Sequence, residues 1–293
     1  MEIYHQPVMV KEVLEILQPE RGGIFVDCTV GEGGHSEAIL RLLPHSGTLI
    51  CIDRDEELLN IAKMRLRNLH PNIHFFHANF SRLKDVLSSI GVKEVDGFLF
   101  DLGVSLRQLQ TPERGFSFQV DGPLDMRMDK NDSVRAEELV NRLSKNELAS
   151  LFRDFGEERL ANVIASAIVE KRNQKPFRTT RELAELIENI AKRRGKIHPA
   201  TKVFMALRIA VNKELEEIYT ALPLAISLLK AGGRICVLSY HSLEDRIIKQ
   251  IFKSNRDKIV ILTPKPLRPS REEISINSRA RSAKLRAAER RCA

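Results

Sequence analysis

Three aspartates stand directly after apolar runs of the chain, and their residue type suits a ligand-binding edge. Asp27 follows residues 24–26, Asp53 follows residues 48–52, and Asp101 follows residues 97–100. Short apolar runs of this kind predict buried strands, and the carboxyl ends of parallel strands meet at one edge of a sheet. Carboxylates at that edge can accept hydrogen bonds from ribose hydroxyls or from an amine, and they favour a positively charged ligand.

A glycine-dense turn between residues 31 and 34 follows the first of these runs and precedes a helical pattern at residues 36–43. Glycine lets the backbone adopt positive φ and approach a ligand closely. The dinucleotide fingerprint Gly-x-Gly-x-x-Gly fails because Ser36 stands where the third glycine belongs. No Gly-Lys-Ser/Thr phosphate loop follows the turn either, so the turn alone is a weak signal.

Asp53 strengthens the evidence for a ligand at the turn, because it lies twenty residues after Gly33 at the end of the second predicted strand. A carboxylate in this position can accept both ribose hydroxyls of an adenosine. The alternative is that Asp53 only caps the following helix. Asp27 could lie close to a ligand cation or orient the turn. A ribose and a positive centre without phosphate favour S-adenosylmethionine as the ligand.

A second polar cluster, Ser239-Tyr240-His241-Ser242, follows the apolar residues 235–238. If residues 235–238 form another parallel strand, this cluster faces the same crevice. Tyr240 could then stack on a base and His241 could accept a proton. The alternative is a helix cap at Ser242.

Apolar runs and helical patterns alternate along the chain, which predicts an α/β fold with a doubly wound, mostly parallel sheet. The alternation stops between residues 106 and 212, where a Gly-, Pro-, Asp- and Arg-rich loop (residues 110–132) precedes helical patterns only. We therefore expect a sheet domain formed by residues 1–105 and 213–293, with an inserted all-helical domain at residues 106–212. An edge strand is expected at residues 283–288.

The composition favours an anionic partner. The 293 residues include 47 Lys and Arg against 39 Asp and Glu, for a net charge of +8, and nucleic acid is the commonest partner of such a chain. The four cysteines lack Cys-x-x-Cys spacing, so neither zinc nor a disulfide framework is indicated. No signal peptide and no apolar run of membrane-spanning length are found, which predicts a cytoplasmic protein.

Several stretches together resemble the bacterial MraW/RsmH family of ribosomal RNA small-subunit (cytosine-N4)-methyltransferases. The matching stretches, in family order, are HQPVMVKEVL, DCTVGEGGHS, CIDRD, ANFSRL, DLGVS, RGFSF-x-x-DGPLDMRMD, VLSYHSLEDR and SRARSAKLRAAER. The resemblance implies a class I (Rossmann-like) methyltransferase fold, S-adenosylmethionine as cofactor, and a cytosine in the decoding region of 16S rRNA as acceptor. It also implies a role in substrate recognition for the helical domain.

The resemblance also implies the residues of the cofactor site. Gly33, Gly34 and His35 would contact the amino-acid end of the cofactor and its backbone, and Asp53 would hold the ribose. Phe80 would lie against the adenine, and Asp101 and Gln108 would complete the pocket. The alternatives without a role in ligand binding are a surface imidazole for His35 and a core position for Phe80.

The catalytic candidates are Asp101, Tyr240 and His241. The exocyclic amine of cytosine is a poor nucleophile, so an enzyme must align it and accept its hydrogen bonds as it becomes positive. Asp101 is the first candidate for that acceptor. Many amino-methyltransferases have two prolines and an aromatic residue after the polar residue here, whereas this chain has Leu102-Gly103-Val104-Ser105. Asp101 could therefore serve the cofactor instead.

Basic residues are spread along the chain rather than gathered in one motif. They include residues 171–178, residues 192–196 and the segment after residue 264, and Arg127 lies in a loop that could reach a flipped-out base. Aromatic residues make up only 5% of the chain, which favours an assembled ribosomal subunit over single-stranded RNA as partner. A DNA methyltransferase and a binding module without catalysis are the alternative functions. The oligomeric state is open, a homodimer being one alternative.

Overall fold

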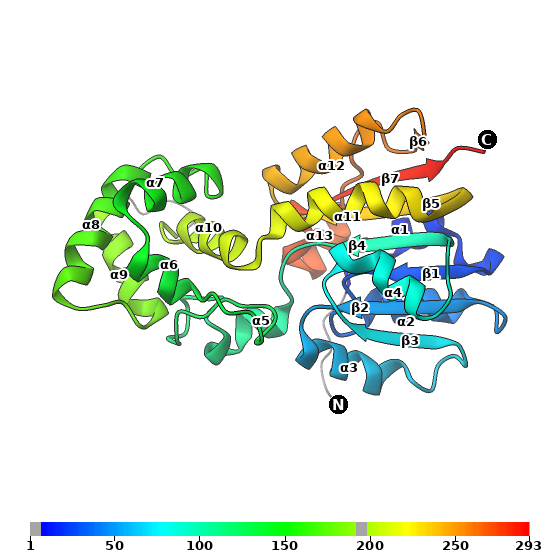
Figure 1. The fold of residues 1–293 in the computed structure, drawn as a ribbon, viewed down its shortest axis with the longest axis horizontal. Helices are drawn as coiled ribbons and strands as arrows, with labels where there is room; N and C mark the ends of the chain where they lie inside the picture. The colour runs from blue at the N-terminus through cyan, green and yellow to red at the C-terminus, as the bar shows by residue number, and fades with distance from the viewer. Residues whose placement is uncertain (1–6, 192–197, 293) are drawn as a thin grey trace. The chain divides into compact units, whose positions relative to one another are not determined.

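A seven-stranded sheet forms the centre of one part of the protein (Figure 1). In the computed structural model, residues 7–191 and 198–292 are described. The strand order is β3-β2-β1-β4-β5-β7-β6. β7 pairs antiparallel with both β5 and β6, and every other pairing is parallel. The expected doubly wound, mostly parallel sheet is therefore confirmed.

The chain divides into two compact units, residues 1–103 with 215–293 and residues 104–214. We call the first the sheet unit and the second the helical unit. The strands are β1 Ile24–Asp27, β2 Thr48–Asp53, β3 Ile73–His77, β4 Val95–Asp101, β5 Leu229–Ser239, β6 Ile259–Ile261 and β7 Lys284–Arg290. The helices around them are α1 Val10–Leu17, α2 Gly34–Leu42, α3 Glu56–Leu66, α4 Leu83–Ser89, α11 Glu214–Leu228, α12 Ser242–Ser254 and α13 Arg271–Ile276.

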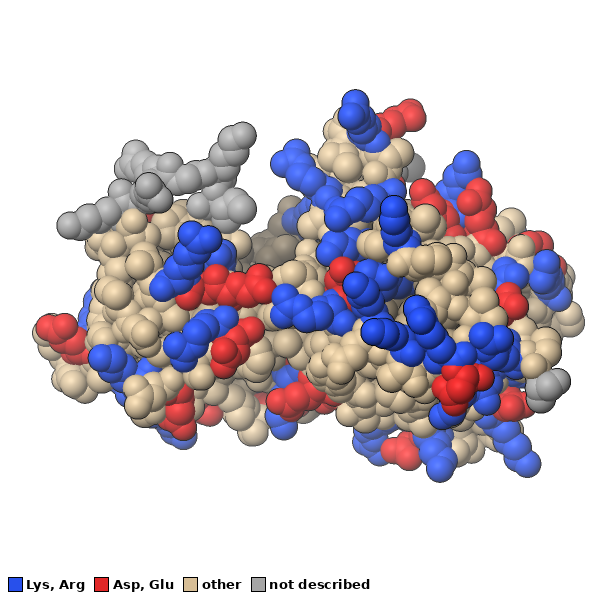
Figure 2. Space-filling view, turned by 90° about the horizontal axis from the view of Figure 1, so that it is seen from above, with Lys and Arg blue, Asp and Glu red and all other residues tan. Residues whose placement is uncertain are grey.

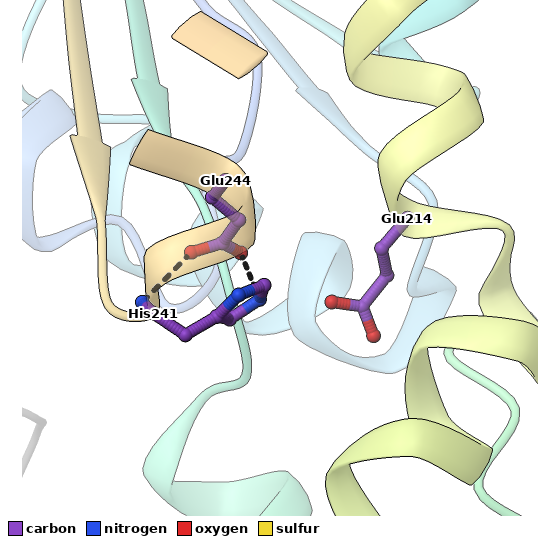
Figure 3. A group of neighbouring side chains, drawn as sticks. All are labelled: Glu214, His241 and Glu244. Atoms are coloured by element: carbon purple, nitrogen blue, oxygen red, sulfur yellow. Dashed lines mark hydrogen bonds and ion pairs between the residues drawn. The ribbon is translucent and has the colours of Figure 1, made fainter. Parts of the chain in front are cut away.

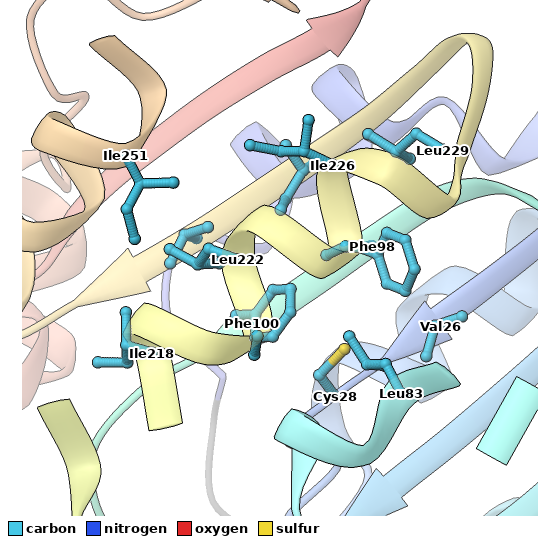
Figure 4. Close-up of a cluster of buried hydrophobic side chains, with 14 of the residues drawn as sticks. Val26, Cys28, Leu83, Phe98, Phe100, Ile218, Leu222, Ile226, Leu229 and Ile251 are labelled. Carbon is cyan, nitrogen blue, oxygen red and sulfur yellow. The ribbon is translucent and has the colours of Figure 1, made fainter. Parts of the chain in front are cut away.

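Helices cover both faces of the sheet, because successive side chains of each strand point to opposite faces. Phe98 and Phe100 of β4 pack with α4, α11 and α12 on one face (Figure 4). Leu99 of the same strand packs with α1, α2 and α3 on the other face. With both faces buried, the strands read as continuous apolar runs, as the sequence showed.

The helical unit has its own core, formed by α6 Ala136–Arg142, α7 Lys145–Asp154, α8 Ala161–Gln174, α9 Thr180–Ala191 and α10 Thr201–Asn212. α5 Leu106–Gln110 also lies in this unit. The buried Asn212 fixes the long loop before α6: its amide oxygen accepts from the Met128 N–H at 2.8 Å, and its Nδ2 donates to the Met126 carbonyl at 2.8 Å. Within the described residues, no helix combines the length and the apolar character needed to cross a membrane.

Three local expectations differ from the structure. β7 is not an edge strand: it lies between β5 and β6, with Leu285, Ala287 and Ala288 fully buried. The helical pattern at residues 157–171 predicts a helix from residue 157, but α8 begins at Ala161, and the backbone at residue 157 adopts φ 48°. α5 was not expected, although Ser105 and Gln108 form the capping box that marks its start.

Candidate active site

The strand order reverses direction between β1 and β4, which places a crevice at the carboxyl ends of these strands. Asp27 ends β1, Asp53 ends β2 and Asp101 ends β4. The parallel register aligns Asp27 with Cys51 of β2 and with Leu99 of β4, so the three strand ends lie on one edge. This edge holds the acids, as the sequence predicted.

The glycine turn adopts backbone conformations that a side chain would strain. Gly31 has φ 53° and Gly33 has φ 86°, in the left-handed region that glycine enters at little cost. A Cβ on Gly33 would lie 3.0 Å from the Leu66 side chain, and one on Gly34 would lie 3.0 Å from Pro7. The turn is therefore closely packed against α3 and the N-terminal segment, which leaves its backbone as the surface for a ligand.

Ser36 holds the turn to the end of β1. Its hydroxyl donates to the Asp27 carboxylate at 2.7 Å, and the Thr29 N–H donates to the same carboxylate at 3.2 Å. Asp27 is only 1% exposed, and burial raises the pKa of its carboxyl, against the lowering effect of the Ser36 hydrogen bond. These contacts favour the second reading of Asp27, in which it orients the turn. The serine that broke the dinucleotide fingerprint is thus part of the turn's own support.

Asp53 is held in place by backbone N–H groups of the glycine turn and of the segment before α3. Oδ2 accepts from the Gly31 N–H at 2.7 Å and Oδ1 accepts from the Asp55 N–H at 2.8 Å. Each oxygen keeps a second lone pair for a ligand hydroxyl. The helix cap of α3 is Asp55, whose side chain accepts from Glu57 and Leu58. Capping therefore does not explain Asp53, and burial raises the pKa of its carboxyl to about 7.

Asp101 lies at the centre of a partly buried hydrogen-bonding group. Its Oδ1 accepts from the Tyr240 hydroxyl at 2.7 Å, and its Oδ2 lies 3.5 Å from His35 Nδ1. The Asp101 N–H donates to the Thr29 hydroxyl at 2.6 Å. Burial raises the pKa of Tyr240 well above its usual value, and the Asp101 charge raises it further, so this phenol stays a neutral donor. The carboxylate is therefore fixed in orientation at the crevice.

His35 is buried, so the surface alternative for it is wrong. It is 5% exposed, and its Nε2 lies 2.9 Å from the Val8 carbonyl oxygen. With Nδ1 facing Asp101, the ring bridges the N-terminal segment and the end of β4. His35 thus contributes to the rigidity of the site, and its contact with a cofactor stays a prediction.

His241 and Glu244 lie at the start of α12 (Figure 3). Glu244, 1% exposed, accepts from the Tyr240 N–H at 2.9 Å and from the His241 N–H at 3.3 Å. Its other oxygen lies 3.1 Å from His241 Nε2. The N-cap of α12 is His241 rather than Ser242. Glu244 therefore orients both Tyr240 and His241, and the sequence offered no sign of this role.

The contacts of Phe80 and Gln108 within the protein differ in kind. Phe80 is only partly buried and packs edge-on against Phe100 at 5.6 Å between ring centroids. Gln108 is 4% exposed in the helical unit, and its Oε1 accepts from the Ser105 N–H at 3.0 Å. Its amide is thus engaged in the α5 cap. The cofactor roles of both residues stay predictions.

The groups along this edge suit the ligand inferred from the sequence. Asp53 offers a carboxylate for ribose hydroxyls, the glycine turn offers bare backbone, and Asp101 adds a carboxylate suited to a positive centre. An open sheet of this order, with the last strand alone reversed, and this donor set define a class I methyltransferase that uses S-adenosylmethionine.

The chain matches the model of the MraW methylase family over residues 2–291. Ribosomal RNA small subunit methyltransferase H of Caldicellulosiruptor saccharolyticus is 46% identical, over 98% of this chain and 99% of the relative. The protein of the same name from Dictyoglomus thermophilum is 47% identical, over 99% of this chain and 98% of the relative. The one from Halothermothrix orenii is 43% identical, over 98% of both. The chain belongs to the MraW methylase family.

Two basic features have different surroundings from those expected. The guanidinium of Arg127 makes four hydrogen bonds within its own loop, to both carboxylate oxygens of Asp125 and to the carbonyls of Lys130 and Asp132. Arg127 therefore holds this loop together instead of extending from it. The basic run at residues 192–196 lies outside the described residues. In the C-terminal segment, Lys284 and Arg286 are ion-paired.

Proposed function

We propose that this protein transfers the methyl group of S-adenosylmethionine to the N4 amine of a cytosine in the decoding region of 16S rRNA. The proposal of an RNA substrate rests on the relatives called ribosomal RNA small subunit methyltransferase H. They align with nearly the whole chain at 43–47% identity. The cytosine, its N4 position and the decoding region are what the resemblance of the sequence to the MraW/RsmH family implies.

Asp101 is the proposed acceptor for the amine. The lone pair of a cytosine amine is delocalised into the ring, so attack requires alignment and a hydrogen-bond acceptor that strengthens as the nitrogen becomes positive. The Asp101 carboxylate is fixed by the Tyr240 hydroxyl at 2.7 Å, which leaves further lone pairs for the amine. Fixing the acceptor before the reaction removes the cost of reorienting it during the reaction.

When bound, S-adenosylmethionine would supply a methyl group activated by its positive sulfonium, and the electron pair of the broken carbon–sulfur bond would stay on sulfur. The cytosine nitrogen forms the new bond to carbon, and Asp101 accepts a hydrogen bond from the amine as positive charge develops there. The surplus amine proton then leaves through Asp101 to solvent. His241, held by Glu244 3.1 Å away, is a second candidate for accepting the proton.

The remaining assignments follow from this reaction. We place the protein in the cytoplasm, with small-subunit rRNA in the assembled subunit as its partner, and we assign recognition of that partner to the helical unit. Two exposed basic residues at the start of α9, Arg178 and Arg181, are consistent with this role. Exposed cations of this kind contact phosphates without reading sequence.

The test is transfer of labelled methyl from S-adenosylmethionine to small subunits from a strain that lacks this protein, followed by mapping of the modified nucleotide. We expect one labelled cytosine, modified at N4. Label on DNA, on another nucleotide, or nowhere would contradict the proposal. Asp101→Ala is expected to bind S-adenosylhomocysteine normally while transfer falls by about 100-fold or more. Loss of cofactor binding in this variant would instead assign Asp101 to the cofactor.

A further inference from the structure

A basic pocket lies in the sheet unit beside β6, the edge strand of the sheet. Its volume is about 300 Å³, and its lining comes from α12, β6, β7 and the segments next to them. Figure 2 shows Lys and Arg side chains gathered over this unit on the side where α12 lies. The basic lining residues are Lys249, Lys253, Arg256, Arg286 and Arg291. No acidic residue of the described chain lines the pocket.

Most of this positive charge is not neutralised by the protein. Lys249, Lys253 and Arg256 are exposed and form no ion pair within the described ranges. The two lysines are four residues apart on α12, so they are neighbours on the helix surface, and like charges at this spacing destabilise a helix. An anion bound between them would relieve this repulsion.

Arg286 is a buried residue of the pocket whose side chain is held in one orientation. It is 6% exposed, and its Nε donates to Asp245 Oδ1 at 2.6 Å. This bond fixes the side chain, and the contacts of Arg286 with the described chain are made through Nε and not through its two terminal nitrogens. A fixed guanidinium with free N–H groups is suited to phosphate oxygens.

The rest of the lining is apolar, from Phe252, Ile259, Val260, Ile261 and Pro264. Val260 of the edge strand is 41% exposed. Apolar surface beside clustered cations suits a phosphate that carries a sugar and a base, and a chain of nucleotides provides several such groups in a row. RNA is therefore the occupant that best matches both parts of the lining.

The pocket lies away from the candidate active site. α12 begins beside His241 and runs away from the edge that carries Asp101 and Tyr240. With a rise of 1.5 Å per residue, Lys249 and Lys253 lie about 12 and 18 Å along the helix from His241. A nucleotide in the pocket is therefore not the nucleotide that reacts.

We propose that this pocket binds backbone phosphates of the substrate RNA several nucleotides from the target base. The inference rests on the proposed RNA substrate, and it adds a second point of attachment within the sheet unit itself. Two separated contacts fix the direction in which the RNA crosses the crevice, since contacts with the backbone position a nucleic acid while base contacts specify it.

The test compares the double variant Lys249→Glu/Lys253→Glu with the matched control Lys84→Glu/Lys93→Glu. Lys84 and Lys93 are exposed lysines of the same unit, and neither lines the pocket. Oligouridylate serves as a probe without sequence information, and its binding is measured at several salt concentrations. Loss of two phosphate contacts is expected to weaken binding about tenfold and to reduce the slope of log K against log salt by about 1.4. The control is expected to keep the wild-type slope.

The same variants are then assayed for methyl transfer to unmodified small subunits. We expect a raised KM for the subunits, an unchanged kcat and unchanged binding of S-adenosylhomocysteine. Equal slopes for the pocket variant and the control would overturn the pocket inference, even if the wild-type protein methylates rRNA. Failure of the wild type to methylate rRNA, with the slope difference present, would instead contradict the proposed function alone.

Two further probes distinguish the source of the anion. Competition by inorganic phosphate as strong as that by oligouridylate would assign the pocket to a free anion. Binding to phosphatidylglycerol vesicles that the pocket variant loses, while oligouridylate binding is unchanged, would assign it to a lipid surface. Either result would overturn the RNA assignment.

Discussion

The protonation of Asp53 is predicted to control the affinity of the cofactor site. Burial raises the pKa of this carboxyl to about 7 in the free protein. Ribose hydroxyls donate to the ionised form, so binding requires loss of the proton from a carboxyl that is half protonated near neutral pH. Affinity is therefore expected to rise as the pH rises through about 7.

The size of the effect follows from the ionised fraction. With a pKa of about 7, roughly one carboxyl in eleven is ionised at about pH 6 and roughly ten in eleven at about pH 8. Affinity is then about tenfold higher at the higher pH, which corresponds to about 1.4 kcal/mol. Adenosine is the appropriate probe, because it carries the ribose but lacks the titratable amino-acid end of the cofactor.

The assay is calorimetric titration of adenosine across this pH range with the wild type, Asp53→Asn and the control Glu56→Gln. Glu56 is an exposed carboxyl three residues away, so its variant should keep the pH dependence. Asp53→Asn should bind more weakly at the higher pH and show no step. A flat wild-type profile, or a step that survives in Asp53→Asn, would refute the assignment of this titration to Asp53.

The raised pKa of Asp53 is also expected to make the stability of the free protein depend on pH, in the direction opposite to the affinity. Between the ordinary pKa of 3.8 and about 7, the folded state holds a proton that the unfolded chain has released. The free energy of unfolding therefore falls as the pH rises through this window and levels off above about 7. Urea titrations at several pH values should show this slope, and Asp53→Asn should reduce it.

Three further variants test the contacts that position the candidate site residues and the glycine turn. Tyr240→Phe removes the 2.7 Å hydrogen bond to the proposed acceptor; kcat is expected to fall about 10- to 100-fold with cofactor affinity retained, and an unchanged kcat would show that the phenol does not position the acceptor. Ser36→Ala removes the 2.7 Å donor of the buried Asp27, so urea denaturation should show about 1–3 kcal/mol lower stability; wild-type stability would mean that this carboxyl is satisfied without it. Gly33→Ala should destabilise the protein more than Gly91→Ala, because both have positive φ but only the first Cβ meets a side chain, at 3.0 Å. Equal melting temperatures for these two variants would contradict the close packing of the turn.

Much of the sheet could be predicted from the sequence, because buried parallel strands leave a local signal. β1, β2 and the second half of β4 are apolar runs that end on an acid, whereas β3 (Ile73–His77) contains two histidines and is only partly buried. β7 left a weaker signal. It spans Lys284–Arg290, and its four buried residues are one leucine, two alanines and the charged Arg286. Its placement depends on pairing with β5, whose residues lie about fifty positions earlier in the chain.

The positions of the candidate acids at strand ends could be predicted from the sequence, but their contacts could not. Asp53 and Asp101 could be named from their places at strand ends, which is a property of local sequence. The hydrogen bond between Tyr240 and Asp101 joins residues 139 positions apart, so no local pattern indicates it. Gln108 shows the reverse case: Ser105 and Gln108 carry the spacing of a capping box, a signal present in the sequence that accounts for the burial of this amide.

The position of β7 connects one edge of the sheet to the candidate site. β7 fills the gap between β5 and β6, so β6 is joined to the rest of the sheet through β7. Its Lys284 and Arg286 also bind Asp245, near the start of α12. The same helix carries Glu244, which accepts from the Tyr240 and His241 N–H groups. Loss of the pairing between β5 and β7 would therefore release both the β6 edge of the sheet and the start of the helix beside the proposed acceptor.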